Sequence, residues 1–194
     1  MNFTGMIRFT PTEKAAPKIG DILLSEPFLD DPYFGRKAVF LCENNKDGAF
    51  GLVLNNFVNI KIADVLEDLT DVSARISIGG PVNSANLYYL HTSPDIEGSN
   101  EIIKGVYLGG EFETLKDKIK AGFTSFRFFI GYSGWSDTQL SDEIRSHSWF
   151  ITRASSKEIM STEGENDEFW KRLINGMGPG YSHIAEAPSD PTLN

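Results

Sequence analysis

One stretch limits the possible folds of this chain more than any other: residues 126–150, FRFFIGYSGWSDTQLSDEIRSHSWF. Its first side chains are mostly aromatic or β-branched, a composition typical of a buried strand. Because glycine lets the backbone turn sharply, we expect the strand to end at Gly131 and the turn to continue through Gly134. This turn should bring Tyr132 and Trp135 close to the end of the strand.

A helix is predicted directly after this turn, over residues 137–145. Ser136 stands three residues before Gln139, the spacing of a capping box in which each side chain accepts a hydrogen bond from the other residue's backbone amide. A returning strand at residues 149–151 completes the unit. The pattern specifies a shape, but it contains no group with an obvious chemical role.

Length and composition favour a single α/β domain. The chain has 194 residues, of which 40% are hydrophobic, enough to bury a full core. Prolines interrupt the polar stretch before residue 19, so we expect residues 1–18 to be a flexible arm. Residues 19–178 should form the domain, and the proline-rich residues 179–194 a flexible tail.

The cellular setting follows from what the sequence lacks. No apolar run approaches the roughly 20 residues that cross a bilayer, and no basic-then-apolar signal pattern begins the chain. A single cysteine, Cys42, excludes an intrachain disulfide and fits a reducing compartment. Because Cys42 falls inside a predicted strand, we interpret it as a buried apolar residue and not as a nucleophile. We therefore expect a cytoplasmic protein without membrane contact.

The net charge argues against direct nucleic-acid binding. The chain carries 18 Lys and Arg against 27 Asp and Glu, for a formal charge of −9. Phosphate backbones are bound chiefly by Lys and Arg that displace counterions, so an acidic chain starts at a disadvantage.

Local patterns predict the remaining elements. Strands are expected at residues 22–24, 38–43, 49–54, 75–78, 87–91 and 106–108. The turn sequence NNKDG, at residues 44–48, predicts a β-hairpin, and residues 92–100 read as a surface loop. Helical spacing of apolar residues predicts helices over residues 62–69, 111–121 and 165–175. The first of these helices should be capped by Asn59.

Four separate motifs, in this order and spacing, carry a family resemblance. They are GDILLSEPFLDDPYFGRKAVFLCEN, GAFGLVLNN, GGPV followed by LYYLH, and GYSGWSDTQLSDEI. With them the chain resembles the bacterial AlgH/YqgE family over roughly residues 19–178. The resemblance implies an α+β fold, with a bifurcated mixed sheet curled into a pseudo-barrel and three to four helices packed outside. It also implies the label of transcriptional regulator, without an established enzymatic activity or catalytic residues.

The candidate functional residues come from several segments. They are Ser25, Glu26, Asp30, Asp31, Arg36, Glu43, His91, Arg127, Tyr132 and Trp135. The first five share one proline-framed loop, where carboxylates near an arginine can bind a ligand or partner, although Asp and Pro also simply build turns. The aromatic candidates can line a pocket, but large aromatic residues more often pack in cores.

Neither a metal nor a cofactor is predicted. The three histidines, His91, His147 and His183, lie in unrelated contexts without ligand spacing. The glycine pairs at residues 79–80 and 109–110 lack the patterns that place amides and a lysine on phosphates, so we interpret them as turns.

Two classes of function therefore remain open. The first is a regulator of gene expression that acts through another macromolecule, most simply a protein, and it is favoured because no catalytic constellation is found. The second is an enzyme or small-ligand binder with a composite polar pocket. Its pocket would gather Glu26, Asp30, Arg36, Glu43, Arg127 and Tyr132. The two classes differ in whether these groups converge in one concave site.

Overall fold

The computed structural model describes residues 16–29 and 31–187. Its strands form one mixed sheet in the order β10-β1-β2-β3-β9-β6-β8-β7, with β5 also paired to β9 and β4 paired to β5. The strands are β1 (Ile22–Ser25), β2 (Ala38–Asn45), β3 (Gly48–Val53), β4 (Phe57–Val58), β5 (Ile76–Ile78), β6 (Val82–His91), β7 (Ser99–Ile103), β8 (Val106–Gly109), β9 (Phe126–Trp135) and β10 (Trp149–Thr152). The helices are α1 (Phe112–Lys120), α2 (Gln139–Arg145), α3 (Ser156–Met160), α4 (Asn166–Gly176) and α5 (Ser182–Ala185), with 3-10 turns η1 (Ile62–Asp64), η2 (Glu67–Leu69) and η3 (Pro179–Tyr181).

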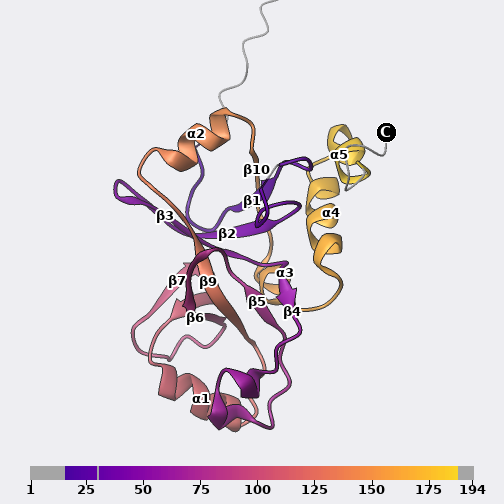
Figure 1. The fold of residues 1–194 in the computed structure, drawn as a ribbon. Coiled ribbons are helices and arrows are strands. Elements are labelled where there is room, and N and C mark those ends of the chain that lie inside the picture. The colour runs from indigo at the N-terminus through magenta and orange to yellow at the C-terminus, as the bar shows by residue number, and fades with distance from the viewer. Residues whose placement is uncertain (1–15, 30, 188–194) are drawn as a thin grey trace, which may run out of the picture.

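Strand β9 joins the two halves of the molecule (Figure 1). Its last residues pair antiparallel with β3, while its earlier residues lie between β6 and the parallel strand β5. The sheet therefore divides at β9 into an upper sheet and a lower sheet, and it is not closed. The expected α+β architecture with a bifurcated mixed sheet is confirmed, but the described residues form five helices where three to four were expected.

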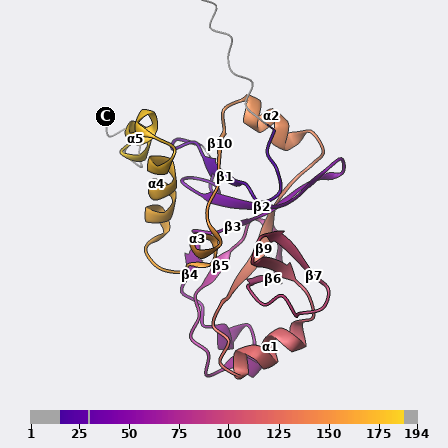
Figure 2. The same ribbon diagram turned by 180° about the vertical axis from the view of Figure 1, so that it is seen from behind.

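The upper sheet is covered on both faces. Helix α2 packs over one face, where Leu23, Val53 and the indoles of Trp135 and Trp149 are buried. Helix α4 covers the other face, where Trp170 lies in the same core as the strands. Figure 2 shows the two helices on different sides of strands β1 and β10.

The lower sheet has a smaller core of its own. Phe126 and Phe128 of β9 pack with Ile76 of β5 against α1, whose inward side chains include Leu115 and Ile119. The turns η1 and η2 close the same side, because Ile62 and Leu69 are buried there.

Gly131 reverses the side-chain alternation within β9. Its φ of +68° lies in the left-handed region that glycine adopts without strain. Ile130 packs on the core of the lower sheet, whereas Tyr132, two residues later, packs on the core that α4 covers. In a regular strand these two residues would share a face. One residue thus directs the two ends of β9 into different layers.

The structure corrects the expected end of this strand. The prediction that it stops at Gly131 is wrong, because β9 continues to Trp135. The predicted capping box forms only in half: the Ser136 amide donates to Gln139 Oε1 at 3.2 Å, but the N-cap of α2 is Thr138 and the helix begins at Gln139.

Other boundaries also differ from the predictions. Residues 62–69 form the two 3-10 turns and not an α-helix, and Lys61, not Asn59, precedes the first of them. The expected loop over residues 92–100 already contains the first residues of β7. Helix α3 was not predicted. Residues 179–185, placed in the tail, form η3 and α5, whereas residues 1–15 and 188–194 lie outside the described residues.

The hairpin and two of the helices are confirmed. Strands β2 and β3 pair from Val39 with Val53 to Asn45 with Gly48, and α1 and α4 occupy the ranges that the apolar spacing indicated. Cys42 is buried with 1% of its surface exposed, as expected for an apolar role, and burial raises the pKa of its thiol.

Candidate functional site

Three of the predicted residues meet beside the β2–β3 hairpin. Glu43, Tyr132 and Trp135 line a surface hollow of about 460 Å³, which we call the hairpin hollow. The other lining residues are Asn45, Asp47, Gly48, Ala49, Phe50, Val82 and Gly134. The pairing of β3 with β9 forms this site, since it brings the hairpin next to the last residues of β9.

Aromatic rings form the floor of the hairpin hollow. The centroid of the Phe50 ring lies 4.8 Å from that of Tyr132, and Tyr88 meets Tyr132 edge-on at 5.5 Å. Gly134 makes room for this arrangement, because a Cβ there would stand 2.9 Å from the Tyr132 ring. Glu43 is the cross-strand partner of Phe50, so its exposed carboxylate stands beside the rings.

The indole of Trp135 is fixed by a residue that the sequence analysis missed. Glu143 of α2 accepts hydrogen bonds on Oε2 from Trp135 Nε1 at 2.8 Å and from Trp149 Nε1 at 2.7 Å. Its Oε1 accepts from Gln139 Nε2 at 2.9 Å. One carboxylate therefore ties α2 to two strands. Glu143 and Trp135 are eight residues apart in the sequence. This separation is not a repeat of one helix or strand, so no sequence pattern indicated the contact.

In the described residues of the proline-framed loop, the polar side chains bond to the nearby backbone. Ser25 is buried, and its Oγ accepts from the Lys37 amide at 2.8 Å. Asp31 Oδ1 accepts from the amides of residues 33 and 34 in a local turn, and Glu26 Oε2 accepts from the Phe28 amide at 3.1 Å. Asp30 lies outside the described residues. The carboxylates of Glu26 and Asp31 thus stabilise local turns.

The two predicted arginines are buried in the interior. Arg127 Nη1 donates to Ile159 O at 2.5 Å and Nη2 to Leu54 O at 2.6 Å. Burial is the main reason that the pKa of Arg127 falls to about 9. Arg36 has a left-handed φ of 52° and donates to the Ala187 carbonyl, where α5 ends. Both guanidinium groups are buried and donate to backbone carbonyls.

A second residue that the sequence analysis missed joins three segments. Asn55 is fully buried; its Oδ1 accepts from the Ala38 amide at 2.7 Å, and its Nδ2 donates to Arg36 O at 2.9 Å and to Asn166 O at 2.6 Å. Asn166 in turn accepts from the Phe57 amide at 2.8 Å. The asparagines of the motif GLVLNN were a visible signal, because a buried amide can satisfy backbone groups at a chain crossing.

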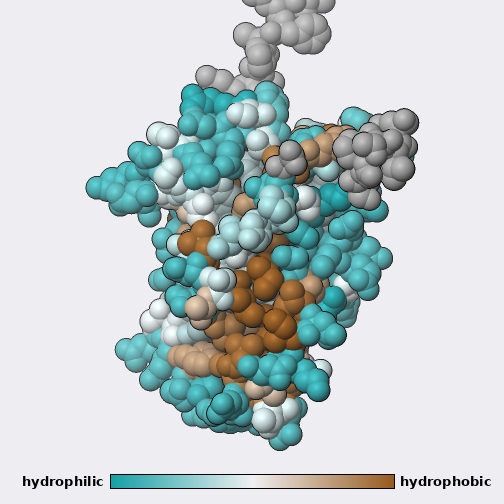
Figure 3. Space-filling model, in the orientation of Figure 1, coloured by the Kyte–Doolittle hydropathy of each residue, from teal (hydrophilic) through white to brown (hydrophobic). Residues whose placement is uncertain are grey.

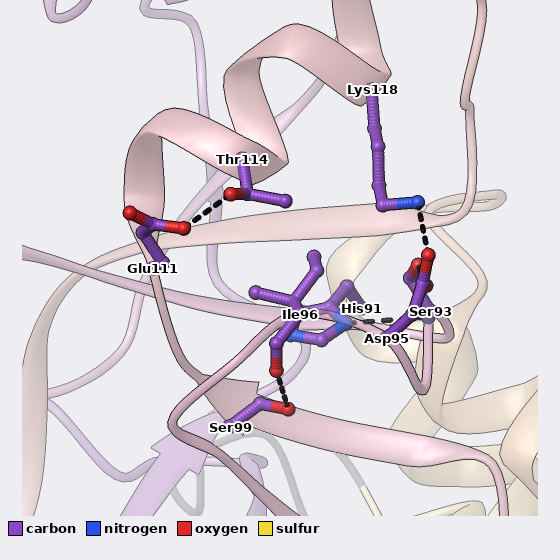
Figure 4. A network of polar contacts seen from close by, with 8 residues as sticks. All are labelled: His91, Ser93, Asp95, Ile96, Ser99, Glu111, Thr114 and Lys118. Atoms are coloured by element: carbon purple, nitrogen blue, oxygen red, sulfur yellow. Dashed lines mark hydrogen bonds and ion pairs between the residues drawn. The ribbon is translucent and has the colours of Figure 1, made fainter.

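His91 belongs to a network beneath helix α1 (Figure 4). The imidazole is fully buried, with Nε2 2.9 Å from Gly109 O and Nδ1 3.3 Å from the Ser93 amide. Ser93 Oγ donates to Asp95, whose other oxygen lies 2.7 Å from Lys118 Nζ. The hydrogen bond from Lys118 is the main reason that the pKa of Asp95 falls to about 2. Because Asp95 bonds to Ser93 and Lys118 and not to the imidazole, the network is no acid–base triad.

These contacts predict a pH-dependent stability. Both ring nitrogens of His91 have partners only as the neutral tautomer with hydrogen on Nε2, and burial lowers the pKa of the imidazole below its ordinary 6.5. The His91 imidazole therefore stabilises the fold fully at pH values above its unfolded-state pKa. This stabilisation is lost as the pH falls through the lowered folded-state pKa. His91→Leu should cost about 1 to 3 kcal/mol at pH 7, because it leaves two buried backbone groups unpaired. The difference in unfolding free energy between His91→Leu and the wild type should narrow toward pH 5, as urea unfolding measures. A difference that stays constant between pH 7 and pH 5 would refute the neutral tautomer assigned to His91.

Hydrophobic side chains gather on the face of the lower sheet against which α1 packs, beside the area that the helix covers. Figure 3 shows a continuous hydrophobic area there. Ile130 of β9 lies directly between Ile78 of β5 and Leu87 of β6, and all three side chains are half-buried. Val58 and Tyr89, also half-buried, border this row. We call these five residues the open face.

Another hollow lies elsewhere, around η1. It measures about 610 Å³ and includes Arg75, whose Nη1 already donates to Thr162 O at 2.9 Å and to Gly164 O at 2.7 Å. Within residues 16–29 and 31–187, no three His, Cys, Asp or Glu residues are grouped to hold a metal. No helix in the same ranges has the length and apolar character that crossing a bilayer requires.

Comparison with known proteins places this geometry in a family. A family model described as AlgH-like matches residues 22–182. The chain belongs to the AlgH-like family. A UPF0301 protein of Bacteroides thetaiotaomicron is 34% identical over 198 residues, covering 100% of both chains. A UPF0301 protein of Cytophaga hutchinsonii is 38% identical over 180 residues, covering 90% of this chain and 98% of that protein.

Two solved structures share the AlgH-like fold. A Corynebacterium diphtheriae protein superposes with a TM-score of 0.76 at 18% identity, covering 89% of this chain and 94% of that one. The AlgH protein of Pseudomonas aeruginosa superposes with a TM-score of 0.68 at 24% identity, covering 91% and 98%.

Proposed function

We propose that this protein regulates gene expression by binding a protein partner on its open face, and that it does not bind DNA directly. The observation that supports this proposal is the row formed by Ile78, Ile130 and Leu87, which crosses three adjacent strands and remains partly exposed. Sheet faces are normally buried against another layer, and contiguous exposed apolar surface marks sites of protein association.

The position of the open face supports recognition of a folded partner. It lies on β9, β5 and β6, which are held by pairing on both sides of β9 and not by a loop. A rigid sheet loses little conformational entropy when a partner binds, so its apolar area contributes more fully to affinity. The partner should therefore present a complementary apolar surface.

The enzyme alternative has weaker support. It required one concave site for residues from the proline-framed loop, the hairpin and β9. Arg36 and Arg127 instead donate to carbonyls inside the protein, whereas Glu43 is exposed at the hairpin. Of the described residues among the six proposed for that site, Glu43 and Tyr132 line a common hollow.

A charged side chain in the open face should abolish regulation. We expect Leu87→Glu to fail to restore normal transcript levels in a strain that lacks the gene, because a carboxylate buried at an apolar interface without a partner costs several kcal/mol. Ile19→Glu is the matched control, since Ile19 is 50% exposed and lies outside the open face. It should restore the transcript levels fully. RNA sequencing of the complemented strains measures both effects.

Two further measurements make the test specific. Thermal unfolding should show that Leu87→Glu is still folded at the temperature of the complementation assay, which separates lost binding from lost folding. A gel shift with promoter DNA at physiological salt should show no more binding than an acidic control protein. Full complementation by Leu87→Glu, or selective sub-micromolar DNA binding, would overturn the proposal.

A further inference from the structure

We infer that the hairpin hollow is a second binding site, which takes the guanidinium group of an arginine on a basic peptide segment. The site is distinct from the open face, because Gly131 places Tyr132 and Ile130 on different layers of the molecule. The inference does not depend on the proposed function.

The floor of the hollow offers aromatic faces. The rings of Phe50 and Tyr132 lie 4.8 Å apart with 33° between their planes, and both are half-buried, so part of their surface faces outward. The rings are held in place by Tyr88 from below and by the bare backbone of Gly134. A cation over such a face is attracted by the electron-rich ring, and arginine adds stacking of its planar group.

The rim of the hollow offers negative charge. Glu43 and Asp47 both line it and both are exposed. Among the described residues, the ion pairs with Lys or Arg involve other carboxylates and neither of these two. Lys46 stands at the tip of the same hairpin but does not line the hollow. A carboxylate beside an aromatic face is complementary to a guanidinium group.

The charge of the whole chain favours the same occupant. A protein of net charge −9 attracts basic segments over a distance and repels acidic ones. An anion would be repelled by the two rim carboxylates, and a neutral sugar would gain nothing from the overall charge. Among ligand classes, a basic peptide therefore fits both the local and the overall charge.

The test uses an acetylated and amidated peptide, Gly-Ser-Arg-Ser-Arg-Gly, and the same peptide with citrulline in place of arginine. Citrulline keeps the planar shape but removes the charge. Titration followed by ¹H–¹⁵N correlation spectra should shift amides at residues 43–50 and 132–135 first. The citrulline peptide should bind at least tenfold more weakly.

Matched variants locate the interaction. Glu43→Gln and Tyr132→Leu should each weaken binding of the arginine peptide about tenfold, whereas Tyr132→Phe keeps the ring and should bind as the wild type does. Glu163→Gln makes the same change in net charge at an exposed residue outside the hollow. If Glu163→Gln weakens binding as much as Glu43→Gln, the peptide senses only overall charge and the inference fails. Equal binding of the citrulline peptide, or shifts confined to other surfaces, would also overturn it.

Discussion

Trp135→Ala is expected to lower the free energy of unfolding by about 3 to 5 kcal/mol, the range for removing a buried aromatic side chain. The indole is only 6% exposed, and its ring lies 5.9 Å from Trp149 and 6.3 Å from Phe34 between centroids. Its removal opens a cavity under α2 and leaves the Glu143 carboxylate with one indole partner in place of two. Urea unfolding monitored by far-ultraviolet circular dichroism measures the loss.

The same structure predicts which second substitution couples to Trp135. Glu143→Ala leaves the N–H groups of Trp135 and Trp149 without this acceptor, so a double-mutant cycle of Trp135→Ala with Glu143→Ala should give an interaction energy of about 0.5 to 3 kcal/mol. Ser136→Ala is the control. Since Ser136 is exposed and does not cap α2, its removal should change stability little and add independently.

Other outcomes would change the role assigned to Trp135. If Trp135→Ala were nearly neutral in stability but abolished peptide binding at the hairpin hollow, the indole would be a recognition residue. If the cycle with Glu143→Ala showed no coupling, the shared carboxylate would not be what positions α2.

Gly131→Ala is expected to cost about 2 to 5 kcal/mol, because two penalties act on one methyl group. The residue has a φ of +68°, which disfavours any side chain, and a Cβ would stand 2.6 Å from Gly80 O and 2.9 Å from Val82 O. The neighbouring atoms belong to the backbone, so they cannot rotate away. The change should also disturb both layers that β9 joins.

Gly176→Ala provides the matched control for the glycine substitution. Gly176 is the last residue of α4, and a Cβ there meets no atom within 4 Å. Alanine should be neutral or stabilise by up to about 1 kcal/mol, since it favours the helix over the unfolded chain. Equal unfolding free energies for Gly131→Ala and Gly176→Ala would mean that β9 tolerates a side chain at the reversal.

The parts of the fold that sequence predicted well are those governed by short-range patterns. The turn at residues 44–48 and the apolar spacing of α1 and α4 specify local structure directly. Residues 62–69 carried the same helical spacing, but their apolar side chains are divided between two 3-10 turns that close the lower core. Tertiary packing there outweighed the local preference.

The end of β9 shows the same limit. Gly131 was correctly identified as a break in regular backbone, yet the break shifts the strand's alternation and does not end it. A sequence pattern cannot distinguish the two cases, because the difference depends on whether β3 is available to pair with the residues that follow.

The candidate site was predicted only in part, for a related reason. Glu43, Tyr132 and Trp135 were named individually, and the pairing of β3 with β9 brings them together. Arg36 and Arg127 were plausible ligands by residue type, but their backbone carbonyl partners have no sequence signature. Glu143 was missed because the two indoles that it binds come from strands on either side of its helix.

The late position of β9 in the chain affects how the protein is made. Strands β1 to β8 leave the ribosome before residues 126–135 do, and three of them have β9 as a neighbour in the finished sheet. Until then β3, β5 and β6 expose backbone groups that β9 later pairs, which makes the nascent chain a substrate for chaperones. Synthesis that stalls before residue 135 leaves two half-sheets without the strand that joins them.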